Sequence, residues 1–369
     1  MVDDAKLAAV ADEVAARYAE VNARYLERIG RKLQEIGTLG PTDLIRLRAT
    51  LETSPDIEET IQELQRLSNH TIDDLVGVFD SIEGSAYNDA MVLKELTQNP
   101  SMFQRARLHE IARASYDATE GRLYNLSNTT NVSSLYRDSV DEAILKRLDG
   151  SIDYGQAKRD VIKQASAEGL KVTYESGHRR RLDSAVRQNV LDGVRDANRQ
   201  MQKYVGEQFG ADGVEVSAHM MSAPDHEPYQ GRQYSKEKFE KIQSDLRRQI
   251  GQWNCHHYVF EILLGVSEPA HSKEQIVDWA LKNKSGVMFE DQHYTLYQAT
   301  QLQREIETEV RSQRDTQVMA RAAGDKETAR QAQSKITALK DKYAELTKLG
   351  PLEDHSDRMT RHRTPNLHL

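Results

Sequence analysis

Apolar side chains recur at every third or fourth position over residues 3–37, and this stripe consists of Leu7, Val10, Val14, Tyr18, Val21, Tyr25, Ile29, Leu33 and Ile36. The spacing is close to the period of about 3.6 residues of an α-helix, so it predicts one long amphipathic helix. Gly40 and Pro41 follow, and proline cannot continue a helix. Because a long helix is marginal on its own in water, we expect its apolar stripe to pack against other helices.

The next stretch, residues 42–120, predicts several shorter helices separated by polar clusters that supply N-cap residues. These clusters are Ser54-Pro55-Asp56, Asn69-His70-Thr71, Gly84-Ser85 and Asn99-Pro100-Ser101. Residues 121–133 are rich in Asn, Thr and Ser and predict a connecting loop. Two further helices are expected over residues 134–148 and 153–167, with Asp153 as the N-cap and Gly169 at the end.

The pattern changes near residue 170, where strands and helices begin to alternate. Residues 170–174 and 214–219 alternate apolar and polar side chains and predict strands, the second with Glu215, Ser217 and His219 on one face. Between these strands, apolar residues from 182 to 205 follow a helical period that ends near Gly210. A helix over 235–250 and a strand over 258–264 complete what we expect to be a compact α+β module.

From about residue 293 the pattern is helical again, and Gly324-Asp325 is a turn signal between two helical stretches. Two antiparallel helical arms are the natural interpretation, although one broken helix also fits. We therefore predict a predominantly helical α+β protein. Its four parts are a helical N-terminal region (1–120), a connecting loop and helices (121–169), a central small α+β module (170–270) and C-terminal helical arms with a tail (271–369).

Composition agrees with long helices that keep one face in water. The chain has 369 residues, of which 38% are hydrophobic and 29% charged, so two or three domains are expected rather than one large core. A net charge of −8 argues against nonspecific DNA binding by the whole molecule. One cysteine excludes an internal disulfide and suits a reducing compartment. The sequence shows neither a signal peptide nor a membrane span, so we expect a soluble protein made inside the cell.

The first candidate chemistry is a metal site. His219, His226, Cys255 and His256, together with His257, offer the nitrogen and sulfur ligands that zinc prefers. Their spacing matches no standard zinc finger, and there is a single cysteine. The alternative is a set of hydrogen-bonded loop histidines, so zinc is a candidate cofactor and the default expectation is none.

The second candidate is a cysteine nucleophile. Cys255 with His226 or His219 as base would suit acyl transfer if an aspartate oriented the histidine. Asp225 adjoins His226 in the sequence and is therefore poorly placed to orient that ring. The sequence around Cys255 contains no Gly-rich turn for an oxyanion, so a buried cysteine at a strand edge is the simpler interpretation.

The third candidate is the basic run Arg179, Arg180 and Arg181, which could contact phosphates. Nearby acidic residues at 183, 192 and 196 favour a salt-bridged helix face instead. The loop that contains Pro224, Pro228 and Gly231 is expected to be rigid, because proline fixes the backbone and glycine permits a close turn.

Several motifs occur in a fixed order between residues 120 and 310. Tyr174-Glu-Ser-Gly177, Leu182-Asp-Ser-Ala-Val-Arg187 and Gly206-Glu-Gln-Phe-Gly-Ala-Asp-Gly213 come first. A signature loop follows, formed by Ser217, His219, Pro224, Asp225, His226, Gln230, Gly231, Asn254 and Cys255. Together these motifs resemble the minor capsid protein 2 family of tailed bacteriophages, which is related in role to the Mu F-like and SPP1-like minor head proteins.

The resemblance implies a structural protein of the phage head, associated with the portal vertex, and not an enzyme. The implied partners are the portal protein and the major capsid protein, with packaged DNA as a further contact, no membrane, and self-association through the helical arms. Tyr18, Tyr25, Leu339 and Tyr343 are the expected anchors, since buried aromatics dominate interfaces. The implied location is the virion head near the portal, and the host cytoplasm during assembly. A virion-carried zinc- or cysteine-dependent hydrolase and a DNA-contacting packaging factor are the alternatives.

Overall fold

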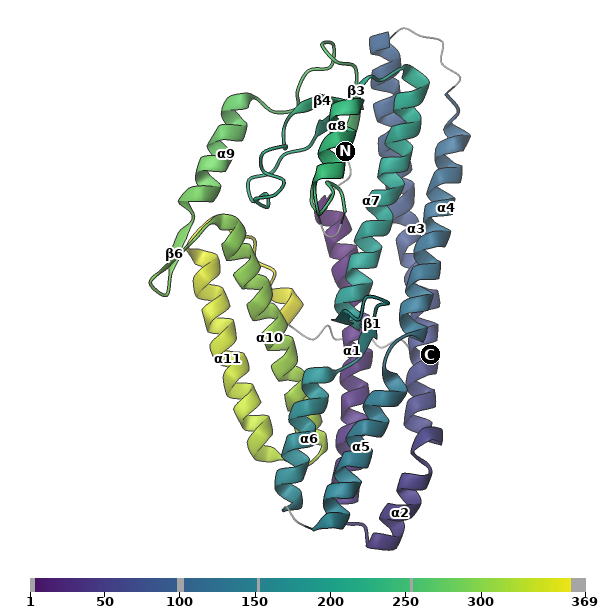
Figure 1. The fold of residues 1–369 in the computed structure, drawn as a ribbon, viewed down its shortest axis with the longest axis vertical. Helices are drawn as coiled ribbons and strands as arrows, with labels where there is room; N and C mark the ends of the chain where they lie inside the picture. The colour runs from purple at the N-terminus through teal and green to yellow at the C-terminus, as the bar shows by residue number, and fades with distance from the viewer. Residues whose placement is uncertain (1–3, 98–102, 151–152, 253–254, 360–369) are drawn as a thin grey trace.

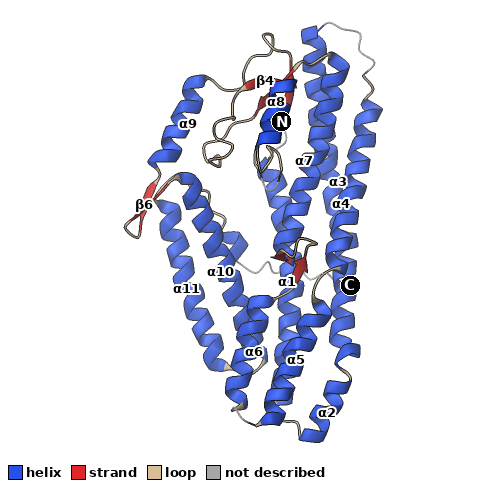
Figure 2. Ribbon diagram, viewed as in Figure 1, coloured by secondary structure: helices blue, strands red, loops and turns tan. Residues whose placement is uncertain are grey.

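The computed structural model describes residues 4–97, 103–150, 153–252 and 255–359. The molecule is elongated, and its long helices run side by side along the long axis (Figure 1). Strands are short and confined to three small sheets (Figure 2). The prediction of a predominantly helical α+β protein is therefore confirmed.

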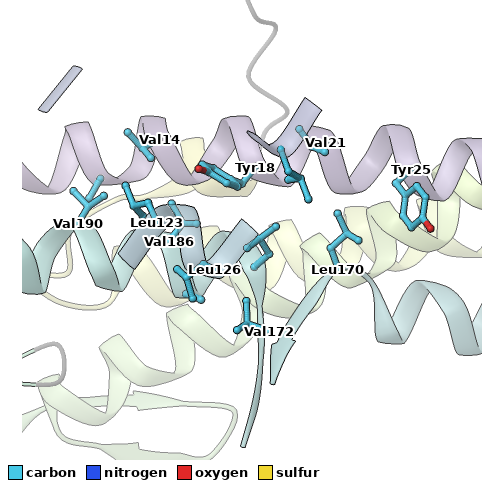
Figure 3. Packing of buried hydrophobic residues seen from close by; sticks show 14 of the residues in the cluster. Val14, Tyr18, Val21, Tyr25, Leu123, Leu126, Leu170, Val172, Val186 and Val190 are labelled. Atoms are coloured by element: carbon cyan, nitrogen blue, oxygen red, sulfur yellow. The ribbon is translucent and has the colours of Figure 1, made fainter. Parts of the chain in front are cut away.

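Four long helices form the centre of the molecule: α1 (Asp4–Ile36), α3 (Pro55–Thr97), α4 (Arg105–Asn128) and α7 (Leu182–Phe209). The apolar stripe predicted for α1 is confirmed, and most of its side chains are buried in one continuous core. In Figure 3, Val14 and Tyr18 of α1 lie beside Leu123 of α4 and Val186 and Val190 of α7. Burial of this stripe supplies the tertiary packing that a helix of this length needs.

Helix α3 corrects the sequence-based prediction. It begins at Pro55 as expected, but it then continues for 43 residues through both Asn69-His70-Thr71 and Gly84-Ser85. The Thr71 hydroxyl donates to the Leu67 carbonyl one turn earlier, so its hydrogen bond is made inside the helix and caps nothing. Thr71 is fully buried, and packing overrides its weak helix propensity. The cluster Asn99-Pro100-Ser101 lies outside the described residues.

The connecting loop expected over residues 121–133 is also wrong for the most part, because α4 runs to Asn128. The buried Ser127 hydroxyl donates to the Leu123 carbonyl and lies 2.6 Å from the Ser68 hydroxyl of α3. Polar residues here join two helices rather than ending one. The next helices, α5 (Val132–Asp149) and α6 (Tyr154–Glu168), confirm the prediction. Two short elements, the helix α2 (Pro41–Ala49) and the 3-10 turn η1 (Leu51–Thr53), lie between α1 and α3.

Two small antiparallel sheets follow. Strands β1 (Lys171–Thr173) and β2 (Arg179–Arg181) form a hairpin that leads into α7. The second sheet has the order β4-β3-β5, in which β3 (Gly213–Val216) is central, with β4 (Gln233–Ser235) and β5 (Val259–Ile262) at the edges. The helix expected over 235–250 is shorter, since α8 spans Lys236–Asp245. We call residues 213–262 the sheet module.

The C-terminal part begins with α9 (Lys273–Ser285) and the hairpin of β6 (Val287–Phe289) and β7 (Gln292–Tyr294). Helices α10 (Leu296–Ala322) and α11 (Lys326–Lys348) then form the predicted antiparallel arms, with the turn at Gly324, and the 3-10 turn η2 (Ser356–Met359) follows.

Helix α10 packs closely on α1. A Cβ on Gly30 would lie 2.5 Å from the Met319 carbonyl oxygen, so glycine is required at this crossing. Met319, Ala320 and Ala323 belong to the same apolar core as the bundle. This apolar core therefore contains residues from different parts of the four that the sequence predicts. The division of the chain into these four parts stays a prediction. Among the described residues, no helix is both long and apolar enough to cross a membrane.

Candidate metal centre

The centre lies where the loop after β3 meets the segment that enters β5. The backbone N–H of Ser217 donates to the Tyr258 carbonyl over 2.9 Å, and the Tyr258 N–H donates to the Ser217 hydroxyl over 2.8 Å. These bonds hold the two segments together just beyond the β3–β5 ladder. The loop then folds back through residues 223–230, which brings His226 against Cys255 and His257.

A sulfur atom lies between two imidazole nitrogens. Cys255 Sγ is 3.2 Å from His226 Nδ1 and 3.3 Å from His257 Nδ1. The exposed fractions of His226, Cys255 and His257 are 1%, 3% and 2%, so the group is shielded from solvent. One ligand atom of each residue lies within 4.8 Å of the other two.

Each of these histidines is held by its other ring nitrogen. His226 Nε2 lies 2.7 Å from the Arg248 carbonyl oxygen, which can only accept, so Nε2 carries a proton. His257 Nε2 lies 3.2 Å from Gln230 Oε1, which also accepts from the His219 N–H over 3.0 Å. The Ser222 hydroxyl is 3.3 Å from the same His257 nitrogen. Both rings therefore turn Nδ1 toward the sulfur.

The surroundings of Cys255 lower the pKa of its thiol. Burial raises the pKa of Cys255, but the hydrogen bond from His226 and two backbone N–H groups outweigh burial and lower it. Burial lowers the pKa of His226, yet its contacts with Cys255 and the Arg248 carbonyl raise it overall. Burial, together with the positive charge of neighbouring groups, lowers the pKa of His257 to about 2. His257 is therefore neutral and can offer a lone pair.

The remaining two histidines are placed differently. The His219 ring centroid lies 4.5 Å from that of His257, and His219 Nε2 is buried without a hydrogen-bond partner. Burial and the charge of Arg195 lower the pKa of His219 to about 4. The His256 ring lies 6.0 Å from the His219 ring and does not join the group around the sulfur. The structure thus brings together His226, Cys255 and His257, with His219 adjacent.

The sequence contains a signal that distinguishes His257 from His256. Residues 255–258 lead directly into β5, and side chains two positions apart in an extended segment point to the same side. Such alternation pairs Cys255 with His257, and the structure brings these two together without His256. The sequence shows the same alternation at Ser217 and His219.

The other residues of the signature loop shape the backbone around the centre. Asp225 accepts two hydrogen bonds from the Arg248 guanidinium, at 2.6 and 3.1 Å. Gly231 has φ +63°, and a Cβ there would lie 2.3 Å from Ile276 Cδ1, so only glycine fits. Pro224 precedes Asp225 in the turn that begins at Ala223. Asn254 lies outside the described residues.

Comparison with known proteins agrees with this arrangement of motifs. A family model described as phage minor capsid protein 2 matches residues 2–348, nearly the whole chain. The chain belongs to the phage minor capsid protein 2 family. No curated protein and no solved structure matches it. The family consists of structural phage proteins, so the expected identity as a minor capsid component of the virion is confirmed.

In this minor capsid protein the cysteine is poorly placed for catalysis. Asp225 Oδ2 is 3.7 Å from His226 Nε2 and is already bound by Arg248, so it does not orient the ring as a triad aspartate would. A cavity of about 1550 Å³ lies between α1, α7 and α10, and its lining includes none of His226, Cys255 and His257. The Cys255 side chain is itself only 3% exposed.

The basic run of this minor capsid protein has partners within the chain. The Arg179 side chain pairs with Glu168, and Arg180 donates to Gln188. Arg181 pairs with Asp315 over 2.8 Å and with Asp183 over 3.3 Å, and its side chain is 15% exposed. These contacts give each arginine a structural role, while phosphate contact by the run stays a prediction.

Proposed function

We propose that this minor capsid protein is located at the portal vertex of the phage head. It acts there in head assembly or in DNA packaging and ejection, through contacts with the portal protein and the major capsid protein. The observation that carries this proposal is the family match over residues 2–348. An elongated helical bundle supports it, because long helices present extended surfaces to partners (Figure 1).

The structure corrects the expected anchors of these contacts. Tyr18 and Tyr25 are fully buried and Tyr343 is 1% exposed, so all three pack inside the chain itself. Leu339 is partly buried against the apolar core of the α10–α11 hairpin. None of these tyrosines can anchor a partner unless the part of the chain that buries it unfolds.

Exposed apolar side chains occur on several helices, and two pairs of them lie on α9 and on α5. Val277 and Leu281 are 57% and 63% exposed and lie one helical turn apart on α9. Leu145 and Leu148 are 43% and 37% exposed on α5 (Figure 1). These two pairs are the surfaces that we propose for partner contacts.

Chemical cross-linking of purified heads, followed by mass spectrometry, tests the proposed location. We expect cross-links to the portal protein and to the shell subunits that surround it. Cross-links spread evenly over shell subunits, with none to the portal protein, would contradict the portal location. Leu281→Ser and Leu145→Ser form a matched pair, and loss of incorporation into heads in only one of them assigns the contact to that helix.

A further inference from the structure

The buried group in the sheet module has the composition of a metal-binding site. It combines one sulfur and two imidazole nitrogens whose ligand atoms lie within 4.8 Å of one another. We propose that His226, Cys255 and His257 bind a zinc ion that stabilises the sheet module, and that His219 occupies the fourth coordination position.

The distances suit tetrahedral zinc. Zn–S and Zn–N bonds of about 2.3 and 2.0 Å at a tetrahedral angle place sulfur and nitrogen about 3.5 Å apart. Cys255 Sγ lies 3.2 and 3.3 Å from the two Nδ1 atoms. Both sulfur–nitrogen separations are therefore close to the value that tetrahedral zinc requires. Mixed sulfur and imidazole ligands favour zinc over calcium or magnesium, which prefer oxygen.

The outer contacts are those that metal-binding histidines require. A ligand histidine donates its second ring N–H to a carbonyl or carboxylate, which fixes the tautomer and the ring orientation. His226 does so with the Arg248 carbonyl and His257 with Gln230 Oε1. The His257 backbone N–H lies 3.4 Å from Cys255 Sγ, which stabilises a thiolate. These contacts turn the Nδ1 atoms of His226 and His257 toward the position that the proposed zinc ion would occupy.

His219 is the natural fourth ligand. Its Nε2 is buried and has no hydrogen-bond partner, which is costly unless something binds it. Its ring contacts the His257 ring at 4.5 Å, and its backbone N–H shares Gln230 Oε1 with His257. These two contacts hold His219 beside the site.

The site is structural, because it is closed and connects three chain segments. His219 follows β3, His226 lies in the loop before β4, and Cys255 and His257 precede β5. Four protein ligands leave no open position for a substrate, as in structural zinc sites. Among its described residues, the sheet module has an apolar cluster of five buried side chains, and small cores commonly need such a cross-link.

Metal analysis of the purified full-length protein tests the proposal directly. We expect one zinc per chain in the native protein, and less than a tenth of that in Cys255→Ser. His256→Ala is the matched control, because His256 adjoins the site without joining it, and it should keep its zinc. His219→Ala should retain zinc but release it to a chelator at least tenfold faster. Native protein that contains no zinc and takes up none from excess zinc would overturn the proposal.

A second measurement does not depend on whether Cys255→Ser folds. In the wild-type chain, Cys255 should resist alkylation while zinc is bound and react after a chelator removes it. Replacement of zinc by cobalt should give the intense visible bands of a tetrahedral site with a thiolate ligand. Equal alkylation rates with and without chelator, and no such bands, would indicate a metal-free cysteine–histidine pair. Neither result bears on portal association, which is measured in assembled heads.

Discussion

The helical bundle and the sheet module bury very different side chains. In the bundle, helices of 24 to 43 residues pack along their length around a continuous apolar core, which includes Tyr18, Tyr25, Leu64 and Val190. In the sheet module, strands of three and four residues enclose five apolar side chains, and beside them lie the buried groups of His226, Gln230, Cys255 and His257.

This difference teaches that the two regions depend on different forces. The apolar area that a helix buries grows with its length, and the hydrophobic effect has no preferred direction. The bundle can therefore lose one contact and still keep its fold. Buried polar groups stabilise only when every member is satisfied, so the sheet module depends on a few specific contacts. Substitutions in each region test this contrast.

The largest effect is expected from Tyr25→Ala in the bundle. Tyr25 is fully buried, its ring centroid lies 6.3 Å from that of Tyr136, and its hydroxyl donates to the Val132 carbonyl over 2.6 Å. Removal of a large buried aromatic ring lowers the free energy of unfolding by about 3–5 kcal/mol. Denaturant unfolding followed by circular dichroism measures this loss.

Tyr25→Phe is the control for the same position, because it keeps the ring and removes only the hydroxyl. It should lose about 1 kcal/mol, because the hydrogen bond from the hydroxyl to the Val132 carbonyl is lost. If Tyr25→Ala were no worse than Tyr25→Phe, apolar packing would not be the main source of bundle stability.

A buried ion-pair network between α7 and α10 gives the next largest effect. Asp183 is 4% exposed and pairs with Arg311 over 3.2 Å and with Arg181 over 3.3 Å. Asp183→Ala leaves two charges partly buried, which costs about 3 kcal/mol. Asp117→Ala, which removes the exposed partner of Arg113, should cost about 0.5 kcal/mol or less. Equal losses in both variants would show that burial does not matter to these pairs.

The same network predicts a dependence on pH. Burial raises the pKa of Asp183, but the charges of Arg181 and Arg311 outweigh burial and hold it below its usual value of 3.8. The stabilisation is therefore complete above this usual value and is lost as the pH falls through the folded-state pKa. Asp183→Ala should accordingly show a shallower loss of stability than the wild type below pH 4, with other carboxylates supplying the rest.

The bundle could be predicted wherever periodicity was uninterrupted. The stripe of α1 gave its bounds almost to the residue, and the α10–α11 hairpin followed from Gly324. The continuity of α3 and α4 was missed because Thr71 and Ser127 are residues that commonly cap or break helices. In the structure their hydroxyls bond within the helix and face neighbouring helices, which is a tertiary contact that local sequence does not encode.

The residue types of the candidate site could be predicted from the sequence, but only some of its individual residues could. His226 and Cys255 were recognised as ligand types, and strand alternation could have selected His257 over His256. The carbonyl of Arg248 could not be foreseen, because a backbone group carries no residue-specific signal. The arrangement depends on the loop that returns over β3, and no sequence pattern fixes that path.

The smallest effect is expected when one methyl group is removed from a buried side chain in each region. Ile29 in the bundle and Ile250 in the sheet module are both fully buried, so Ile29→Val and Ile250→Val should each lower the free energy of unfolding by about 1 kcal/mol.

Hydrogen exchange shows which part of the molecule each substitution destabilises. Ile250→Val should speed exchange about fivefold in residues 213–262 alone if this module opens on its own. Ile29→Val should instead speed exchange throughout α1, α4 and α7, because their shared core unfolds together. Faster exchange in α7 of Ile250→Val would mean that the sheet module and the bundle unfold as one unit. The two regions would then differ in the forces that stabilise them but would unfold together.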